Sequence, residues 1–127
     1  MRDIEFRGKR KDNGEWICGY FFQIWEECSI LWGTTNGIPN MDEVIPETVG
    51  QYTGLKDKNG VKIFEGDIVK NGFSGTWVIQ PLENGSFSLL GICKEYKGRN
   101  YLLSALNRDV EVIGNIHDNP EFLEAGL

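Results

Sequence analysis

Residues 59–90 read NGVKIFEGDIVKNGFSGTWVIQPLENGSFSLL, and the segment repeats one pattern: a short apolar run followed by a glycine turn. The turns fall at Asn59-Gly60, Glu65-Gly66-Asp67, Asn71-Gly72 and Asn84-Gly85. Asn-Gly pairs favour the positive-φ positions of tight hairpins. Short strands with such turns between them are typical of a small barrel or sandwich. The segment therefore predicts a mainly β structure.

The N-terminal third continues this pattern. Residues 4–7 alternate apolar and charged side chains, a turn follows at 12–14, and the aromatic-rich run 16–22 returns. This order predicts a β-hairpin. Residues 29–32 predict a third strand, and the acidic stretch 39–46, which lies between two prolines, is expected to be irregular.

The composition of the chain changes near residue 48, which predicts two parts: an N-terminal β region over 1–48 and a second region, a small barrel or sandwich with a terminal helix, over 49–127. Residues 50–60 are interpreted as a polar loop. In the second part, residues 101–106 suggest a short helical turn. Alternation over 109–116 predicts a strand.

A short terminal helix is expected to start at Asn119-Pro120-Glu121 and to run through Phe122 and Leu123. Asn at the N-cap, Pro at the first helical position and an acid beside the positive end of the helix dipole favour such a start.

Length and composition limit the possible classes of protein. The chain has 127 residues, 40% of them hydrophobic, and 16 glycines. That is enough for one compact domain or two very small ones. No run approaches the roughly 20 apolar residues of a membrane span, and the charged start leaves no apolar region for a signal peptide. We therefore expect a cytoplasmic location and no membrane partner.

The side chains that usually carry catalysis are scarce. His117 is the only histidine, and no GxSxG or phosphate-binding glycine motif is present. Asp57, Glu65 and Asp67 match no metal-site template, and Asp67 is better explained as a turn residue that accepts backbone N–H groups. Cys18, Cys28 and Cys93 lack CxxC spacing and are interpreted as small apolar fillers. The sequence predicts no enzyme, cofactor or metal site.

One polar segment is the candidate binding surface. Its binding residues are Tyr52, Thr53, Lys56, Asp57, Lys58 and Asn59. Exposed loops on a rigid scaffold commonly carry recognition. The alternative is that Thr53, Asp57 and Asn59 only hydrogen-bond the loop to itself, as such side chains often do in turns.

Charge is distributed in blocks along the chain, whose formal net charge is −6. Residues 12–54 carry −7 and residues 55–108 carry +3. The basic block holds seven candidate phosphate contacts: Lys56, Lys58, Lys62, Lys70, Lys94, Lys97 and Arg99. Its candidate stacking groups are Tyr52, Phe73, Tyr96 and Tyr101. Nucleic-acid binding is therefore a second hypothesis, and unpaired strand edges predict a possible homo-oligomer.

Five segments resemble the YopX-like family of phage and prophage proteins. They are residues 6–10, 13–16, 50–60, 64–69 and 110–120. The resemblance implies a mostly β protein whose C-terminal part is similar to an SH3-like barrel. It implies no established activity and supplies no catalytic or cofactor residues. We expect a non-enzymatic protein-interaction module in the bacterial cytoplasm, with a host or phage protein as partner; the alternative is a nucleic-acid-binding barrel.

Overall fold

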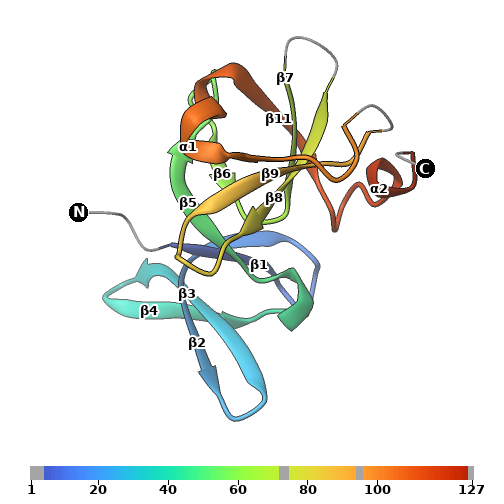
Figure 1. The fold of residues 1–127 in the computed structure, drawn as a ribbon. Coiled ribbons are helices and arrows are strands. Elements are labelled where there is room, and N and C mark those ends of the chain that lie inside the picture. The colour runs from blue at the N-terminus through green and yellow to red at the C-terminus, as the bar shows by residue number, and fades with distance from the viewer. Residues whose placement is uncertain (1–4, 72–74, 94–95, 126–127) are drawn as a thin grey trace. The chain divides into compact units, whose positions relative to one another are not determined.

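The computed structural model describes residues 5–71, 75–93 and 96–125. The chain divides into two compact units, Met1–Tyr52 and Thr53–Leu127. The division lies four residues after the boundary that the sequence predicts. Figure 1 shows both units as mainly β structure.

Strands β1 to β5 and one 3-10 turn make up the first unit, with β5 continuing into the second. Their bounds are β1 (Phe6–Lys9), β2 (Trp16–Ile24), β3 (Glu27–Thr35), β4 (Ile38–Glu43), η1 (Pro46–Thr48) and β5 (Gly50–Lys56). They belong to an antiparallel sheet of order β4-β3-β2-β1-β5-β6, in which β6 is Lys62–Phe64. The predicted β1–β2 hairpin is confirmed, since Lys9 pairs with Trp16 across its turn.

Two expectations about this part of the chain are wrong. The stretch predicted to be irregular contains β4, which pairs with β3 in spite of Pro39. Proline is tolerated there because β4 is an edge strand. The predicted polar loop begins as a strand, because Gly50 and Gln51 pair with β1. Only the part after Lys56 is a turn.

A small apolar cluster stabilises the first unit. Cys28, Ile30 and Val44 are buried, and Ile17 and Phe21 pack against them. Side chains alternate between the two faces of a strand, so Cys18, next to Ile17, is exposed. The prediction of an apolar filler is therefore confirmed for Cys28 and wrong for Cys18. Cys93 is half-buried.

The second unit contains a second antiparallel sheet, of order β10-β9-β8-β7-β11. Its strands are β7 (Asp67–Asn71), β8 (Thr76–Pro81), β9 (Phe87–Gly91), β10 (Asn100–Leu102) and β11 (Val110–Asn115). Helix α1 (Leu103–Leu106) and turn η2 (Asn107–Asp109) connect β10 to β11, and α2 (Glu121–Ala125) follows. The predicted helical turn and terminal helix are confirmed, whereas β10 was not predicted.

An SH3-like barrel was predicted for the C-terminal part, and no closed barrel is found among the described residues. Hydrogen bonds leave β10 and β11 as the two edges of this sheet. Helix α1 and η2 carry the chain from one edge to the other, and the two edge strands are not paired with each other. The architecture is mainly β, with two antiparallel sheets and a short C-terminal helix.

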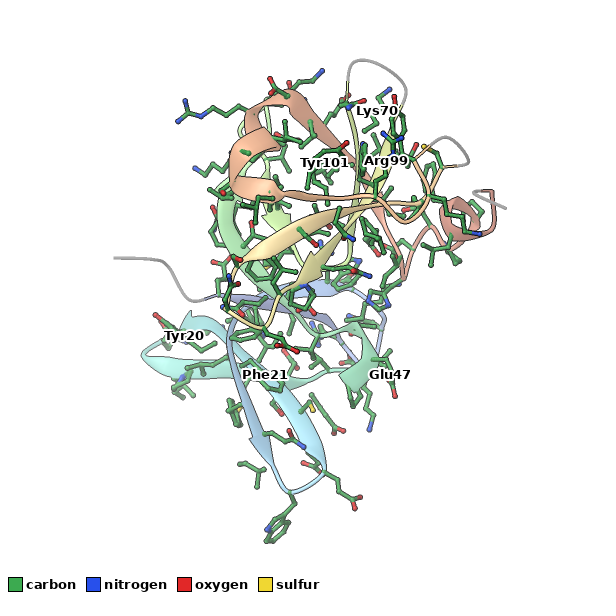
Figure 2. The ribbon with its side chains drawn as sticks, viewed as in Figure 1. Tyr20, Phe21, Glu47, Lys70, Arg99 and Tyr101 are labelled. Carbon is green, nitrogen blue, oxygen red and sulfur yellow. The ribbon has the colours of Figure 1, made fainter. Side chains whose placement is uncertain are left out.

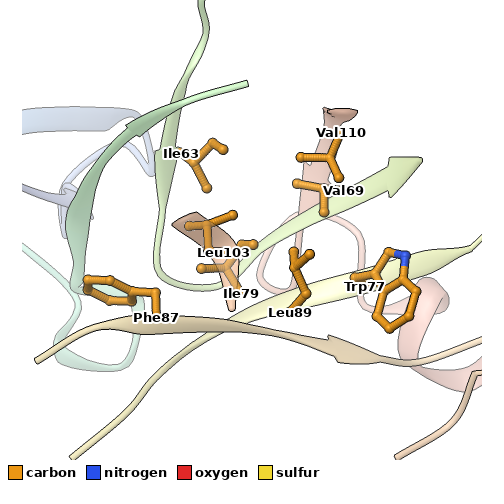
Figure 3. Packing of buried hydrophobic residues seen from close by; sticks show 8 residues of the cluster. All are labelled: Ile63, Val69, Trp77, Ile79, Phe87, Leu89, Leu103 and Val110. Atoms are coloured by element: carbon orange, nitrogen blue, oxygen red, sulfur yellow. The ribbon is translucent and has the colours of Figure 1, made fainter. Parts of the chain in front are cut away.

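Both faces of this second sheet are covered. One face packs the larger core cluster shown in Figure 3: Ile63, Val69, Trp77, Ile79, Phe87, Leu89, Leu103 and Val110. On the other face Ile68, Val78 and Ile92 pack with Ile116 and with Phe122 of α2. The terminal helix is therefore part of the core. No helix among the described residues is long and apolar enough to cross a bilayer.

Candidate functional site

The turn from Asp57 to Val61, here called the Asp57 turn, is organised by one buried carboxylate. Its Oδ1 accepts the backbone N–H groups of Asn59 at 2.8 Å and Val61 at 2.9 Å. Its Oδ2 accepts the N–H of Val112 in β11 at 2.9 Å. One side chain therefore closes the turn and attaches it to a strand 55 residues away in sequence.

These bonds also set the protonation state of Asp57. Burial alone raises the pKa of a carboxyl, but the N–H groups of Val112, Val61 and Asn59 together outweigh it. The pKa of Asp57 is accordingly lowered from its ordinary value. Hydrogen bonds to a charged acceptor favour the charged form, so the carboxylate is ionised near neutral pH.

Main-chain contacts fix the turn further. Lys58 donates its N–H to the Val110 carbonyl at 3.0 Å, and the Asn107 side chain donates to the Lys56 carbonyl at 2.7 Å. Beside the turn lies an open hollow of about 510 Å³, lined by Leu55, Ser104, Ala105, Asn107, Arg108 and Asp109. The Lys56, Lys58 and Asn59 residues are exposed. A rigid backbone here carries polar side chains that face solvent.

The six predicted binding residues fall into two groups. Tyr52 and Thr53 are only 4% and 3% exposed, and Asp57 is also buried. The Thr53 hydroxyl donates to the Ile63 carbonyl at 2.8 Å. Thr53 and Asp57 thus form the hydrogen bonds within this segment that the structural alternative expects. Of the six, Lys56, Lys58 and Asn59 are accessible to a partner. Asn107 and Arg108, which line the neighbouring hollow, were not predicted.

Two further motifs are structural. Asp67 is buried and accepts the Phe64 N–H at 2.8 Å, as the sequence predicted for this turn residue. The buried Asn115 accepts the N–H groups of His117 and Asp118 at 3.0 and 2.9 Å, and Asn119 accepts the N–H of Asn115. Over the described residues, no three His, Cys, Asp or Glu side chains gather as metal ligands would.

A second exposed surface combines aromatic rings with positive charge. It consists of Tyr96, Lys97, Arg99 and Tyr101, and we call it the aromatic patch. Trp77 supports the patch, with ring centroids 5.2 Å from Tyr96 and 5.4 Å from Tyr101. The Arg99 guanidinium lies over the Tyr96 ring at 5.7 Å. Figure 2 labels Arg99 and Tyr101 at this place.

The patch retains part of the predicted nucleic-acid surface. Tyr96 is half-buried and Tyr101 is 43% exposed, so both rings are accessible at the surface. Tyr52 is buried and is removed from the candidate stacking groups. Phe73 and Lys94 lie outside the described residues.

The two antiparallel sheets and the turns closed by buried Asp57, Asp67 and Asn115 define a mainly β protein whose polar motifs support its backbone. The chain belongs to the YopX protein family, whose model matches residues 5–124. The structure is similar to the crystal structure of protein EF1440 from Enterococcus faecalis, with a TM-score of 0.58 and 24% identity. The likeness covers 97% of this chain and 99% of that one, and it concerns the fold. No curated protein matches this chain.

Proposed function

We propose that this protein is a non-enzymatic interaction module that acts in the cytoplasm of a bacterial cell during phage or prophage life. Its partner is a host or phage protein, and its recognition surface is the exposed side of the Asp57 turn with the adjoining hollow. The observation that carries the proposal is the contrast between the buried Asp57 carboxylate and the exposed Lys56, Lys58 and Asn59 beside it.

A rigid turn favours binding because little conformational entropy is lost when the partner docks. Lys56 and Lys58 place two positive charges next to a hollow to which Arg108 adds a third and Asp109 a negative charge. The polar lining of Ser104 and Asn107 offers hydrogen bonds. We infer that the partner presents an acidic, polar segment to this surface.

The strand order of the second sheet supports an SH3-like description of this unit. Strands β7 to β10 form a meander, and β11 returns to pair with β7 at the opposite edge. A 3-10 turn precedes that returning strand. This connectivity supports an SH3-like arrangement with an open sheet. Folds of this class serve many functions, so the order supports the fold alone.

Reversing the charge of the turn tests the proposed surface. In capture from a lysate of phage-infected or lysogenic cells, Lys56→Glu with Lys58→Glu is expected to lose the specific partner. The matched control is Lys62→Glu with Lys70→Glu, which changes the same charge at exposed positions outside the turn and should retain the partner. If both double variants recover the same specific protein equally well, the Asp57 turn is not the binding surface for that protein.

The aromatic patch favours a second candidate, the binding of single-stranded nucleic acid. Exposed rings next to Lys97 and Arg99 combine base stacking with phosphate contacts. We expect a complex with an oligonucleotide at low salt, and Lys97→Glu with Arg99→Glu should abolish it. Each cation that contacts a phosphate contributes about 0.7 to the slope of log affinity against log salt. A mobility-shift titration without any complex at low salt excludes this candidate.

A further inference from the structure

The tip of the β2–β3 hairpin exposes a tryptophan at a position that suits glycine. Trp25 is 93% exposed and has a φ of 55°. The other non-glycine residue with positive φ among those described is Asn36, and asparagine tolerates this region far better than a bulky side chain. The folded chain gives the Trp25 ring almost no burial to offset this unfavourable backbone conformation.

The neighbours of Trp25 give the tip a definite chemistry. Ile24 before it is 57% exposed, and Glu26 and Glu27 after it are exposed as well. Among the described residues, no ion pair involves either glutamate, although the charge of Glu27 adds to that of Glu43 in raising the pKa of Lys11. We call Ile24–Glu27 the Trp25 tip. It presents one large ring, one aliphatic side chain and two carboxylates, and Figure 1 shows the joined ends of β2 and β3 extending past β4.

A surface that fits this tip must offer rings for Trp25 and cations for the two glutamates. The aromatic patch has both, with Tyr96 and Tyr101 beside Lys97 and Arg99. Among the described residues, no ion pair involves Lys97 or Arg99. Arg also stacks favourably on the face of Trp. The two surfaces are thus complementary in charge and in aromatic character.

We propose that the Trp25 tip of one copy binds the aromatic patch of a second copy of this chain. The charge blocks agree with this pairing, because the tip belongs to residues 12–54, which carry −7, and the patch to residues 55–108, which carry +3. Nucleic acid would compete for the patch, but it would leave the exposed Trp25 without a role. The proposal does not use the Asp57 turn and is independent of the function proposed for it.

The geometry of such a contact determines its stoichiometry and strength. The tip and the patch are different surfaces, so the contact is heterologous and extends into chains or closes into a ring. A buried tryptophan covers about 150–250 Å², and a tip of four residues stays well below the roughly 1,200 Å² of a stable interface. We expect a reversible association with a dissociation constant of about 10 µM to 1 mM.

A charge exchange between two variants tests the pairing directly. Variant X carries Glu26→Lys and Glu27→Lys, and variant Y carries Lys97→Glu and Arg99→Glu. Each is expected to lose self-association because its own tip and patch repel each other. In a mixture that holds each variant at the wild-type concentration, both contacts are again complementary, so the average mass from sedimentation velocity should return to the wild-type level.

Trp25→Gly completes the test, because glycine suits the positive φ and the hairpin is expected to fold. The variant should lower the association constant for self-association at least about tenfold, which is the loss expected when a central aromatic anchor is removed. Ile38→Ser is the control, since it removes an apolar side chain of 69% exposure from the start of β4 and should change nothing. Wild-type protein that stays monomeric up to about 1 mM, or a mixture of X and Y that fails to associate, overturns the proposal.

Discussion

Asp57→Ala is expected to lower the free energy of unfolding by about 3–5 kcal/mol, because three backbone N–H groups lose their acceptor together. Hydrogen bonds to a charged group contribute about 1.5–3 kcal/mol each, and unsatisfied buried donors add a desolvation cost. The change also detaches the Asp57 turn from β11, since Val112 is one of the three donors. Urea denaturation followed by circular dichroism measures the loss.

Two variants separate this effect from a simple loss of charge. Asp57→Asn keeps an acceptor oxygen but brings an amide group that donates. Its free energy of unfolding should therefore lie between those of wild type and Asp57→Ala. Glu83→Ala removes an exposed acid and should stay within about 0.5 kcal/mol of wild type. An Asp57→Ala protein that is as stable as Glu83→Ala would show that the turn does not depend on its carboxylate.

The same carboxylate gives the stability a pH dependence of known sign. The folded-state pKa of Asp57 is lowered, so its contribution is present above the unfolded value of about 3.9. The contribution is lost as the pH falls through the lower, folded-state pKa. The difference in stability between wild type and Asp57→Ala should therefore be largest near neutral pH and shrink below about pH 4.

Local signals were enough for the hairpins and the terminal helix. The β1–β2 hairpin and α2 depend on residues close in sequence, such as the Asn-Gly turn and the Asn119-Pro120 start. Strands β4 and β5 were missed because their composition suggests loops and their partners decide their conformation. The hollow beside the Asp57 turn depends on Asn107 and Arg108, about 50 residues away, which no local pattern indicates.

Three polar residues in the motifs that indicate the family have structural roles. Asp57, Asp67 and Asn115 each lie in a segment of the resemblance, and each accepts backbone N–H groups from a buried position. These three side chains therefore support the folded backbone. The two surfaces proposed for binding instead use exposed residues such as Lys56 and Trp25. For Trp25, its exposure of 93% and its positive φ in the structure distinguished it from other surface residues.

Gly19→Ala is expected to be the most damaging single-methyl change in the first unit. Strand β2 changes partner here: Gly19 pairs with Phe6 of β1, and the next residue, Tyr20, pairs with Leu31 of β3. A Cβ on Gly19 would collide with the carbonyl oxygen of Leu31, which is backbone and cannot turn aside. The two strands would have to separate at the point where the hairpin leaves β1.

We expect Gly19→Ala to cost about 3 kcal/mol, the upper part of the range for overpacking, because no side chain can move to relieve the contact.

Gly37→Ala is the matched control. Its φ is +79° and nothing lies within 4 Å of the added methyl, so only the left-handed backbone opposes it, at about 1 kcal/mol. Thermal and urea denaturation of both variants compare the two causes. If Gly19→Ala costs no more than Gly37→Ala, β2 and β3 do not approach each other as closely as the structure has them. A larger loss, with faster amide exchange in β2 and β3, means that Gly19 is required because β3 passes over it.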